Sequence, residues 1–137
     1  MRNLDENERT LLGDSFLHLA QAVGAFRIEN YHRLTPKMQR LIRTYHKNLI
    51  DYADTFYETA TTFVVEDAAT SIASIQQIAT GIKDTLQQVK KVQQVINTFG
   101  MATKLGASII SKQPIAITAS LLELLSSFGK LKADTKK

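Results

Sequence analysis

The sequence predicts an all-α protein, folded as an antiparallel up-down-up-down four-helix bundle. Apolar residues recur at steps of three and four through most of the chain, which is the spacing of amphipathic helices. The repeats fall into four stretches of similar length, residues 5–33, 36–64, 67–98 and 100–128. The connections between them are short, and short connections favour antiparallel neighbours. The alternative is three long helices followed by a short apolar C-terminal helical hairpin.

The first predicted helix covers residues 5–33. Its apolar positions follow one another at steps of four and three: Leu12, Phe16, Leu19, Val23 and Phe26. Gly13 and Gly24 lie inside this stretch, and each lowers the helix preference by about 1 kcal/mol relative to alanine. We interpret both glycines as places where a neighbouring helix approaches closely, so that tertiary packing holds the helix together.

Thr35 and Pro36 mark the start of the second helix. Threonine can accept a hydrogen bond from a free backbone amide as the N-cap residue, and proline suits the first helical position. The apolar stripe that follows comprises Met38, Leu41, Ile42, Tyr45, Leu49, Tyr52, Phe56, Ala60 and Phe63. The β-branched cluster at residues 61–65 continues this stripe, so we expect it to be helical. Glu66 and Asp67 then mark a turn.

The most regular pattern lies between Thr70 and Phe99, and it predicts one long central helix. The seam alternates steps of three and four, as in a coiled coil: Ile72, Ile75, Ala79, Ile82, Leu86, Val89, Gln93 and Ile96. We expect the other helices to cover this seam.

The fourth arm, residues 100–128, is predicted to be broken near Pro114. Gly100 and Gly106 are expected to be further weak points, and the last helix is expected to run from Pro114 to Phe128. Gly129 suits the left-handed position just after a helix. The resulting prediction is a single helical-bundle domain at residues 1–129, with a basic C-terminal tail at residues 130–137.

Charge is segregated along the chain, although the formal net charge is only +4. Antiparallel packing would gather basic residues at one end of the bundle and acidic residues, among them Asp51, Asp54 and Glu58, toward the other. The basic residues predicted to form a face for an anionic partner are Arg33, Lys37, Arg40, Arg43, Lys47, Lys90 and Lys91. An antiparallel pair of second helices would also set each basic half against an acidic half.

Catalytic and metal sites are not predicted. Cysteine is absent, which removes thiol catalysis and thiolate metal sites. Glu29 and His32 form one E-x-x-H pair, whereas di-iron bundles need two such pairs and further carboxylates. No nucleotide-binding or hydrolase motif is present. We therefore expect no enzyme activity, no cofactor and no small-molecule substrate. The basic residues are too dispersed to favour nucleic-acid binding.

These features predict a non-enzymatic assembly or adaptor protein that acts by helix–helix association, as an oligomer or with another protein. The alternative is a membrane-associating protein that uses the apolar 100–128 segment and an adjacent basic end on anionic lipid. The residues predicted for a membrane or partner face are Phe99, Leu105, Ile109, Ile110, Ile115, Ile117 and Leu121; they would close the core instead if this segment is simply the fourth arm. We expect a cytoplasmic location, membrane-peripheral under the alternative, because no Sec signal peptide or conventional transmembrane segment is recognised.

Overall fold

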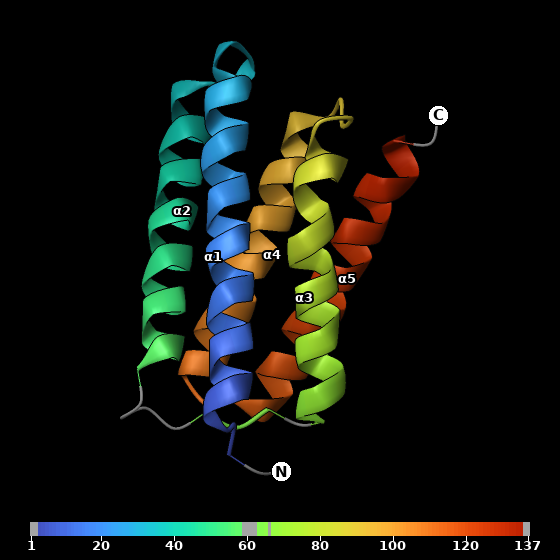
Figure 1. Ribbon diagram of the computed structural model, residues 1–137. Coiled ribbons are helices and arrows are strands. Elements are labelled where there is room, and N and C mark those ends of the chain that lie inside the picture. The colour runs from blue at the N-terminus through green and yellow to red at the C-terminus, as the bar shows by residue number, and fades with distance from the viewer. Residues whose placement is uncertain (1–2, 59–62, 66, 136–137) are drawn as a thin grey trace.

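The computed structural model describes residues 3–58, 63–65 and 67–135, and it confirms an all-α bundle. The described residues form five long helices rather than four arms (Figure 1). They are α1 (Glu6–Glu29), α2 (Pro36–Tyr57), α3 (Ala68–Leu86), α4 (Val92–Ile110) and α5 (Pro114–Thr135), with a short 3₁₀ turn, η1 (Tyr31–Arg33), between α1 and α2.

The five helices alternate in direction and enclose one core. Helix α1 packs against α2 and α3, whereas α4 packs against α2 and α5, and α3 also contacts α5. Helices α2 and α5 therefore lie at opposite edges of the bundle (Figure 1). Aromatic rings fill the core at two levels, where Phe16 meets Phe56 with ring centroids 5.1 Å apart and Phe26 meets Phe99 at 5.6 Å.

The predicted starts of the first two helices are confirmed. Asp5 and Glu8 form a capping box at the start of α1, in which each side chain accepts a hydrogen bond from the other's backbone amide. Thr35 caps α2, and its hydroxyl accepts a hydrogen bond from the Met38 amide at 3.1 Å. Pro36 is the first helical residue of α2.

The second helix ends earlier than predicted, at Tyr57. Residues 63–65 are extended instead of helical, and the Leu4 amide donates to the Phe63 carbonyl at 2.8 Å. The Phe63 ring is nevertheless buried against Phe56, which explains why the stripe continues past the end of the helix. Ala60 and residues 61–62, which the prediction also made helical, lie outside the described residues, as does Glu66.

The prediction of one continuous helix from Thr70 to Phe99 is wrong. Helix α3 ends at Leu86, and the chain reverses through residues 87–91 before α4 begins at Val92. The turn is fixed by the amide of Val89, which donates to the Leu86 carbonyl, and by burial of the Val89 side chain. The Arg33 guanidinium also donates to the Lys90 carbonyl. The seam residues of α3 are buried as predicted.

Gly100, Gly106 and Gly129 do not end helices. A Cβ at Gly106 would lie 2.5 Å from Tyr52 Cδ2 and 2.8 Å from Phe16 Cε2, so this glycine allows α4 to approach α1 and α2. Helix α5 does begin at Pro114 as predicted, but it continues through Gly129 to Thr135. Residues 130–135 are thus part of the last helix rather than of a separate tail.

Candidate interaction surfaces

Most of the residues predicted for a membrane or partner face are buried in the core. The buried members are Phe99, Leu105, Ile109, Ile117 and Leu121, and Ile110 is half-buried. They pack inside because α4 and the inner side of α5 complete the bundle. Of the predicted set, only Ile115 lies fully on the surface, where 88% of its area is exposed.

Helix α5 carries a second, exposed stripe opposite its buried side. The most exposed large apolar side chains of this stripe are Ile115 and Leu122, and Leu122 is 62% exposed. We call the stripe the outer face of α5 and define it as Ile115, Thr118, Ala119, Leu122, Leu125, Ser126 and Gly129, all of which are exposed. These residues recur at steps of three and four, so they share one side of the helix. None of them is charged.

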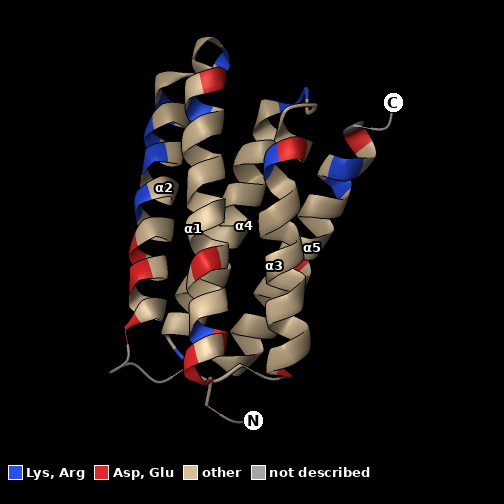
Figure 2. Ribbon diagram, viewed as in Figure 1, with Lys and Arg blue, Asp and Glu red and all other residues tan. Residues whose placement is uncertain are grey.

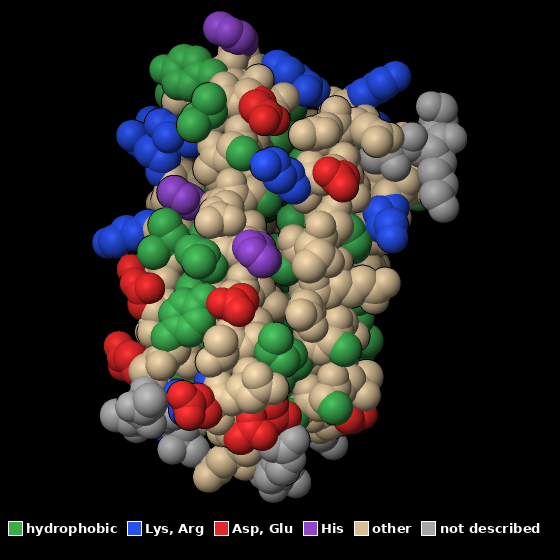
Figure 3. Space-filling view, viewed as in Figure 1, with side chains coloured by type: hydrophobic (Ala, Val, Ile, Leu, Met, Phe, Trp, Pro, Cys, Tyr) green, Lys and Arg blue, Asp and Glu red, His purple; other side chains and the backbone are tan. Residues whose placement is uncertain are grey.

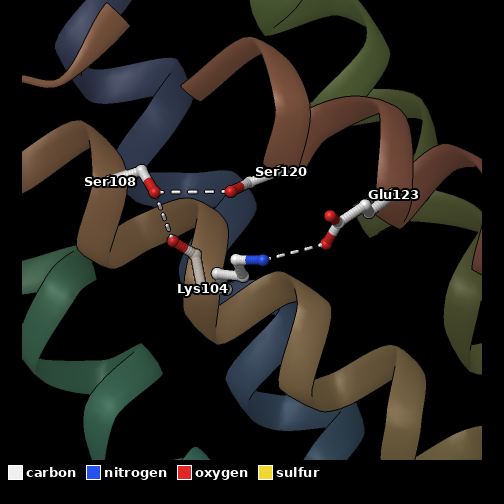
Figure 4. A network of polar contacts seen from close by, with 4 residues as sticks. All are labelled: Lys104, Ser108, Ser120 and Glu123. Atoms are coloured by element: carbon white, nitrogen blue, oxygen red, sulfur yellow. Dashed lines mark hydrogen bonds and ion pairs between the residues drawn. The ribbon is translucent and has the colours of Figure 1, made fainter. Parts of the chain in front are cut away.

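The inner side of α5 is fixed to α4 by polar as well as apolar contacts. Figure 4 shows two of the polar contacts. Lys104 forms an ion pair with Glu123 at 3.2 Å, and the Ser108 and Ser120 hydroxyls lie 3.3 Å apart. The Ser108 hydroxyl also donates to the Lys104 carbonyl. These contacts hold α5 to the bundle, and the outer face stays exposed among the residues that the structure describes.

A groove of about 570 Å³ runs between α4 and α5, next to the outer face. It is lined by Gln94, Asn97, Met101, Leu122, Glu123, Ser126, Ser127 and Lys130. The Oε1 atom of Gln94 is buried there without a hydrogen-bond partner among the described residues.

The residues predicted to face an anionic partner are all exposed. Figure 2 shows that most of them gather where α1 meets α2 and α3 meets α4. We call this the basic end and define it as Arg33, Lys37, Arg40, Lys90, Lys91, Lys130 and Lys132, which lie at or near the α1–α2 turn, the α3–α4 turn and the end of α5. Glu29, Asp84 and Asp134 are acidic residues at the same end. Arg43 and Lys47 lie further along α2. The acidic end consists of Asp5, Glu6, Glu8, Asp54, Glu58 and Asp67, with Arg9 and Lys112 as basic residues nearby. The face shown in Figure 3 has the same polarity.

The outer side of α2 changes sign along its length. Its basic half contains Lys37, Arg40, Arg43 and Lys47, and Asp51 and Asp54 follow. Among the residues that the structure describes, none of these six forms an ion pair. The outer side of α2 is thus an exposed surface with a positively charged half and a negatively charged half. Leu41 is the exposed large apolar residue on it.

The histidine and carboxylate pattern does not form a metal site. Glu29 is the last residue of α1 and His32 lies in η1, and both are exposed. Within the described part of the chain, no group of three or more His, Asp or Glu side chains is placed to hold a metal ion. Arg33, next to His32, donates to the Asn30 side chain and to the Lys90 carbonyl.

Near the acidic end, the surroundings of Tyr57 raise its pKa. The Tyr57 hydroxyl donates to Asp14 Oδ1 at 2.6 Å. Partial burial, this hydrogen bond and the negative charges of Asp14 and Asp54 raise the pKa of Tyr57 to about 12. The Tyr57 ring lies against Gly13, where a Cβ would come within 2.5 Å of it. The Tyr57 phenol stays neutral at physiological pH and keeps its proton for the hydrogen bond to Asp14. We therefore interpret the arrangement as a structural contact between α1 and α2.

Helix α5 is also the one described helix that is long and apolar enough to cross a membrane, judged by length and composition alone. The core helix of a water-soluble bundle can meet the same criterion, but only 28% of this stretch is buried within the protein. No protein-family model, curated protein or solved structure matches the chain.

Proposed function

We propose that this protein is a non-enzymatic assembly protein that associates with itself through helix–helix contact at the outer face of α5. The observation that carries the proposal is the exposed stripe itself, four turns long, apolar or small throughout and free of charge. An edge helix of a solitary bundle needs only one apolar side, and its other side is normally polar. Contiguous exposed apolar surface of this kind is typical of interaction sites.

The charged stripe on α2 is the other candidate for helix–helix association, as the sequence suggested. Exposed ion pairs contribute only about 0.2–1 kcal/mol each. Association loses an estimated 4–15 kcal/mol or more in translational and rotational freedom. A contact made of α2 charges alone would therefore be weak, so we assign the main contact to α5. The charges orient the partner and modulate the affinity.

The test is sedimentation equilibrium of the full chain over a wide concentration range. We expect a discrete oligomer whose affinity falls only modestly from low to high salt, since salt screens charge but leaves apolar contact intact. The Leu122→Glu variant should be monomeric. The matched control is Ile28→Glu, which adds the same charge at an exposed apolar residue of α1 and should associate like the wild type. Circular dichroism checks that both variants fold.

Two results would contradict the proposal. If the wild type remains monomeric at every concentration and salt level, self-association is excluded. If an oligomer forms but Leu122→Glu leaves it intact, the outer face of α5 is not the contact. Dissociation of that oligomer at high salt would then favour the α2 stripe.

Membrane association is the second candidate, and the composition and length of α5 favour it. The arrangement of the helices differs from the one this idea assumed. The turn between α4 and α5 lies near the acidic end, so the apolar residues Ile110 and Ile115 are remote from most of the basic residues (Figures 1 and 2). Flotation on vesicles of phosphatidylcholine with phosphatidylserine tests this candidate directly.

A further inference from the structure

We infer that the outer face of α5 packs against the same face of a second copy, in an antiparallel pair with its two-fold axis at Leu122. The inference rests on the proposed function, because it specifies the geometry of the proposed self-association. A two-fold contact must use one surface on both copies, and that surface must be complementary to itself. The outer face of α5 meets this condition in size, in packing and in charge.

Side-chain sizes on the outer face are complementary about Leu122. In the antiparallel pair, residues equally far from Leu122 in opposite directions face one another. Ile115 then faces Gly129, and Ala119 faces Leu125. Thr118 faces Ser126, and Leu122 meets its own copy at the axis. Ile115 and Leu125 therefore lie opposite small residues, which allows the helices to approach closely on both sides of the Leu122–Leu122 contact at the axis. A parallel pair would instead set Ile115 against Ile115 and Gly129 against Gly129.

Gly129 is not explained by packing within the chain. A Cβ at this position would meet nothing within 4 Å, and the residue lies inside α5. Glycine in a helix interior is destabilising relative to alanine. Gly106 also lies inside a helix, but neighbouring rings occupy the space that its Cβ would take. By the same logic, the open space at Gly129 is suited to a side chain from outside the chain, and Ile115 of a second copy fills it.

The charge of the bundle favours the same orientation. Helix α5 runs from the acidic end to the basic end, and Leu122 lies near its middle. An antiparallel partner therefore places its acidic end beside the basic end of the first copy. A parallel partner would set like charges side by side, which is unfavourable. Lys112 and Arg9 moderate the negative charge of the acidic end without reversing it. Lys112 would face Lys132 of the second copy, so charge favours the antiparallel orientation through the two ends as a whole and not through this pair.

The charged pair beside the axis is compatible with this contact. Lys104 and Glu123 already neutralise one another at the edge of the outer face, so no unpaired charge is brought to the centre of the interface. The contact spans four turns of one helix per copy, which is small for a stable dimer. We therefore expect a dissociation constant on the order of 1–100 μM.

Disulfide trapping tests the geometry, because the natural chain has no cysteine and a single introduced thiol reports one position. Under mild oxidation, the Leu122→Cys variant should form a covalent dimer with itself. Thr118→Cys should not link to itself, since the two copies of this position would be about 12 Å apart along the helix axis. That separation exceeds the Cα–Cα distance of about 7 Å that a disulfide can span. Mixing Thr118→Cys with Ser126→Cys should give the mixed dimer.

The matched control for trapping is Thr44→Cys, an exposed position on α2, which should stay monomeric under the same oxidation. Intact-mass measurement identifies each product. Self-linking of both Thr118→Cys and Ser126→Cys would show a parallel pair, which overturns the inference but leaves the proposed self-association standing. An oligomer in the ultracentrifuge with no trapping at α5 overturns the inference by moving the contact to another surface.

A wild type that is monomeric in solution overturns both the inference and the proposed function. If that monomer floats with vesicles of phosphatidylcholine and phosphatidylserine, the outer face of α5 is a lipid-binding surface instead. Different results therefore refute the antiparallel geometry and the proposed self-association, and a further result identifies lipid binding.

A size exchange tests the contact between Ile115 and Gly129 without relying on oxidation. Gly129→Leu should weaken the dimer by about tenfold or more, because the new side chain meets Ile115 of the partner, although it meets nothing in its own chain. Adding Ile115→Ala should recover much of the affinity, while Ile115→Ala alone weakens it. Unchanged or tighter association of Gly129→Leu, or no recovery in the double variant, would exclude this pairing.

Discussion

Gly106→Ala is the substitution whose effect on stability the structure defines most sharply. In an unhindered helix interior, glycine to alanine would stabilise the protein by about 1 kcal/mol. At Gly106 the added Cβ would lie 2.5 Å from Tyr52 and 2.8 Å from the fully buried Phe16. Both values are below the closest approach of carbon atoms, so α4 must move away from α1 and α2. Overpacking of a core costs about 1–3 kcal/mol. We therefore expect a net loss of up to about 2 kcal/mol in the free energy of unfolding.

Urea unfolding followed by circular dichroism at 222 nm measures this loss. The matched control is Gly81→Ala in α3, where the added Cβ would make one ordinary contact of 3.6 Å with Phe128. The control should be as stable as the wild type or up to about 1 kcal/mol more stable. The change from glycine to alanine is thus expected to lower the free energy of unfolding at position 106 and to keep or raise it at position 81. Equal or greater stability of Gly106→Ala would show that the close approach of α4 is not as described.

Two further predictions concern α2. The pKa of Tyr57 is raised to about 12, so the folded state binds the phenolic proton more tightly than the unfolded state does. The contribution of the protonated Tyr57 to stability is therefore present below pH 10 and is lost between pH 10 and about 12. Burial and the charge of Asp51 also raise the pKa of Tyr52. A spectrophotometric titration at 295 nm should therefore show late tyrosine ionisation, and Tyr57→Phe should remove the part near pH 12. An unchanged signal near pH 12 in Tyr57→Phe would contradict the assignment to Tyr57. Thr35→Ala should lower the free energy of unfolding by about 1 kcal/mol through loss of the N-cap. Thr44→Ala, inside the same helix and exposed, should leave the stability unchanged or slightly raise it, and equal losses in both variants would argue against the cap.

The sequence predicts the first half of the fold well because its signals are local. The N-cap at Thr35 and the first-turn proline determine the start of α2, and the stripe from Met38 to Phe56 faces the core except for Leu41, which is exposed. The end of α2 could not be read in the same way. Phe63 keeps its place in the periodic pattern although its backbone is extended, because an apolar residue just outside a helix can be buried beside the helix it follows.

The break between α3 and α4 is hidden for a similar reason. Residues 87–91 contain neither glycine nor proline, and Val89 stays in phase with the seam while it anchors the turn. The hydrogen bond from Arg33 to the Lys90 carbonyl joins segments far apart in the sequence, and no local pattern contains it. Conversely, Gly100 and Gly106 resemble helix breaks but serve close packing, with Tyr45 and Tyr52 as their respective neighbours.

The candidate surface was only partly predictable. Most of the predicted basic residues do lie toward one end, because alternation of helix direction follows from short connections, whereas Arg43 and Lys47 lie further along α2. The outer face of α5 was missed, although Ile115, Leu122 and Gly129 recur every seven residues. A helix with two apolar sides gives no sign in its own sequence of which side the rest of the chain covers. Ile117 and Leu121 belong to the covered side, and only packing decides this.

The odd number of described α-helices has a practical consequence for labelling and fusion. With five alternating helices, the chain enters near Asn3 at one tip of the rod and leaves near Thr135 at the other (Figure 1). A fluorescent donor fused before α1 and an acceptor fused after α5 are then separated by the full length of one subunit. In an antiparallel two-fold dimer, each donor would lie next to the acceptor of the other subunit. Energy transfer would then occur between the two molecules and would disappear when dilution dissociates the dimer.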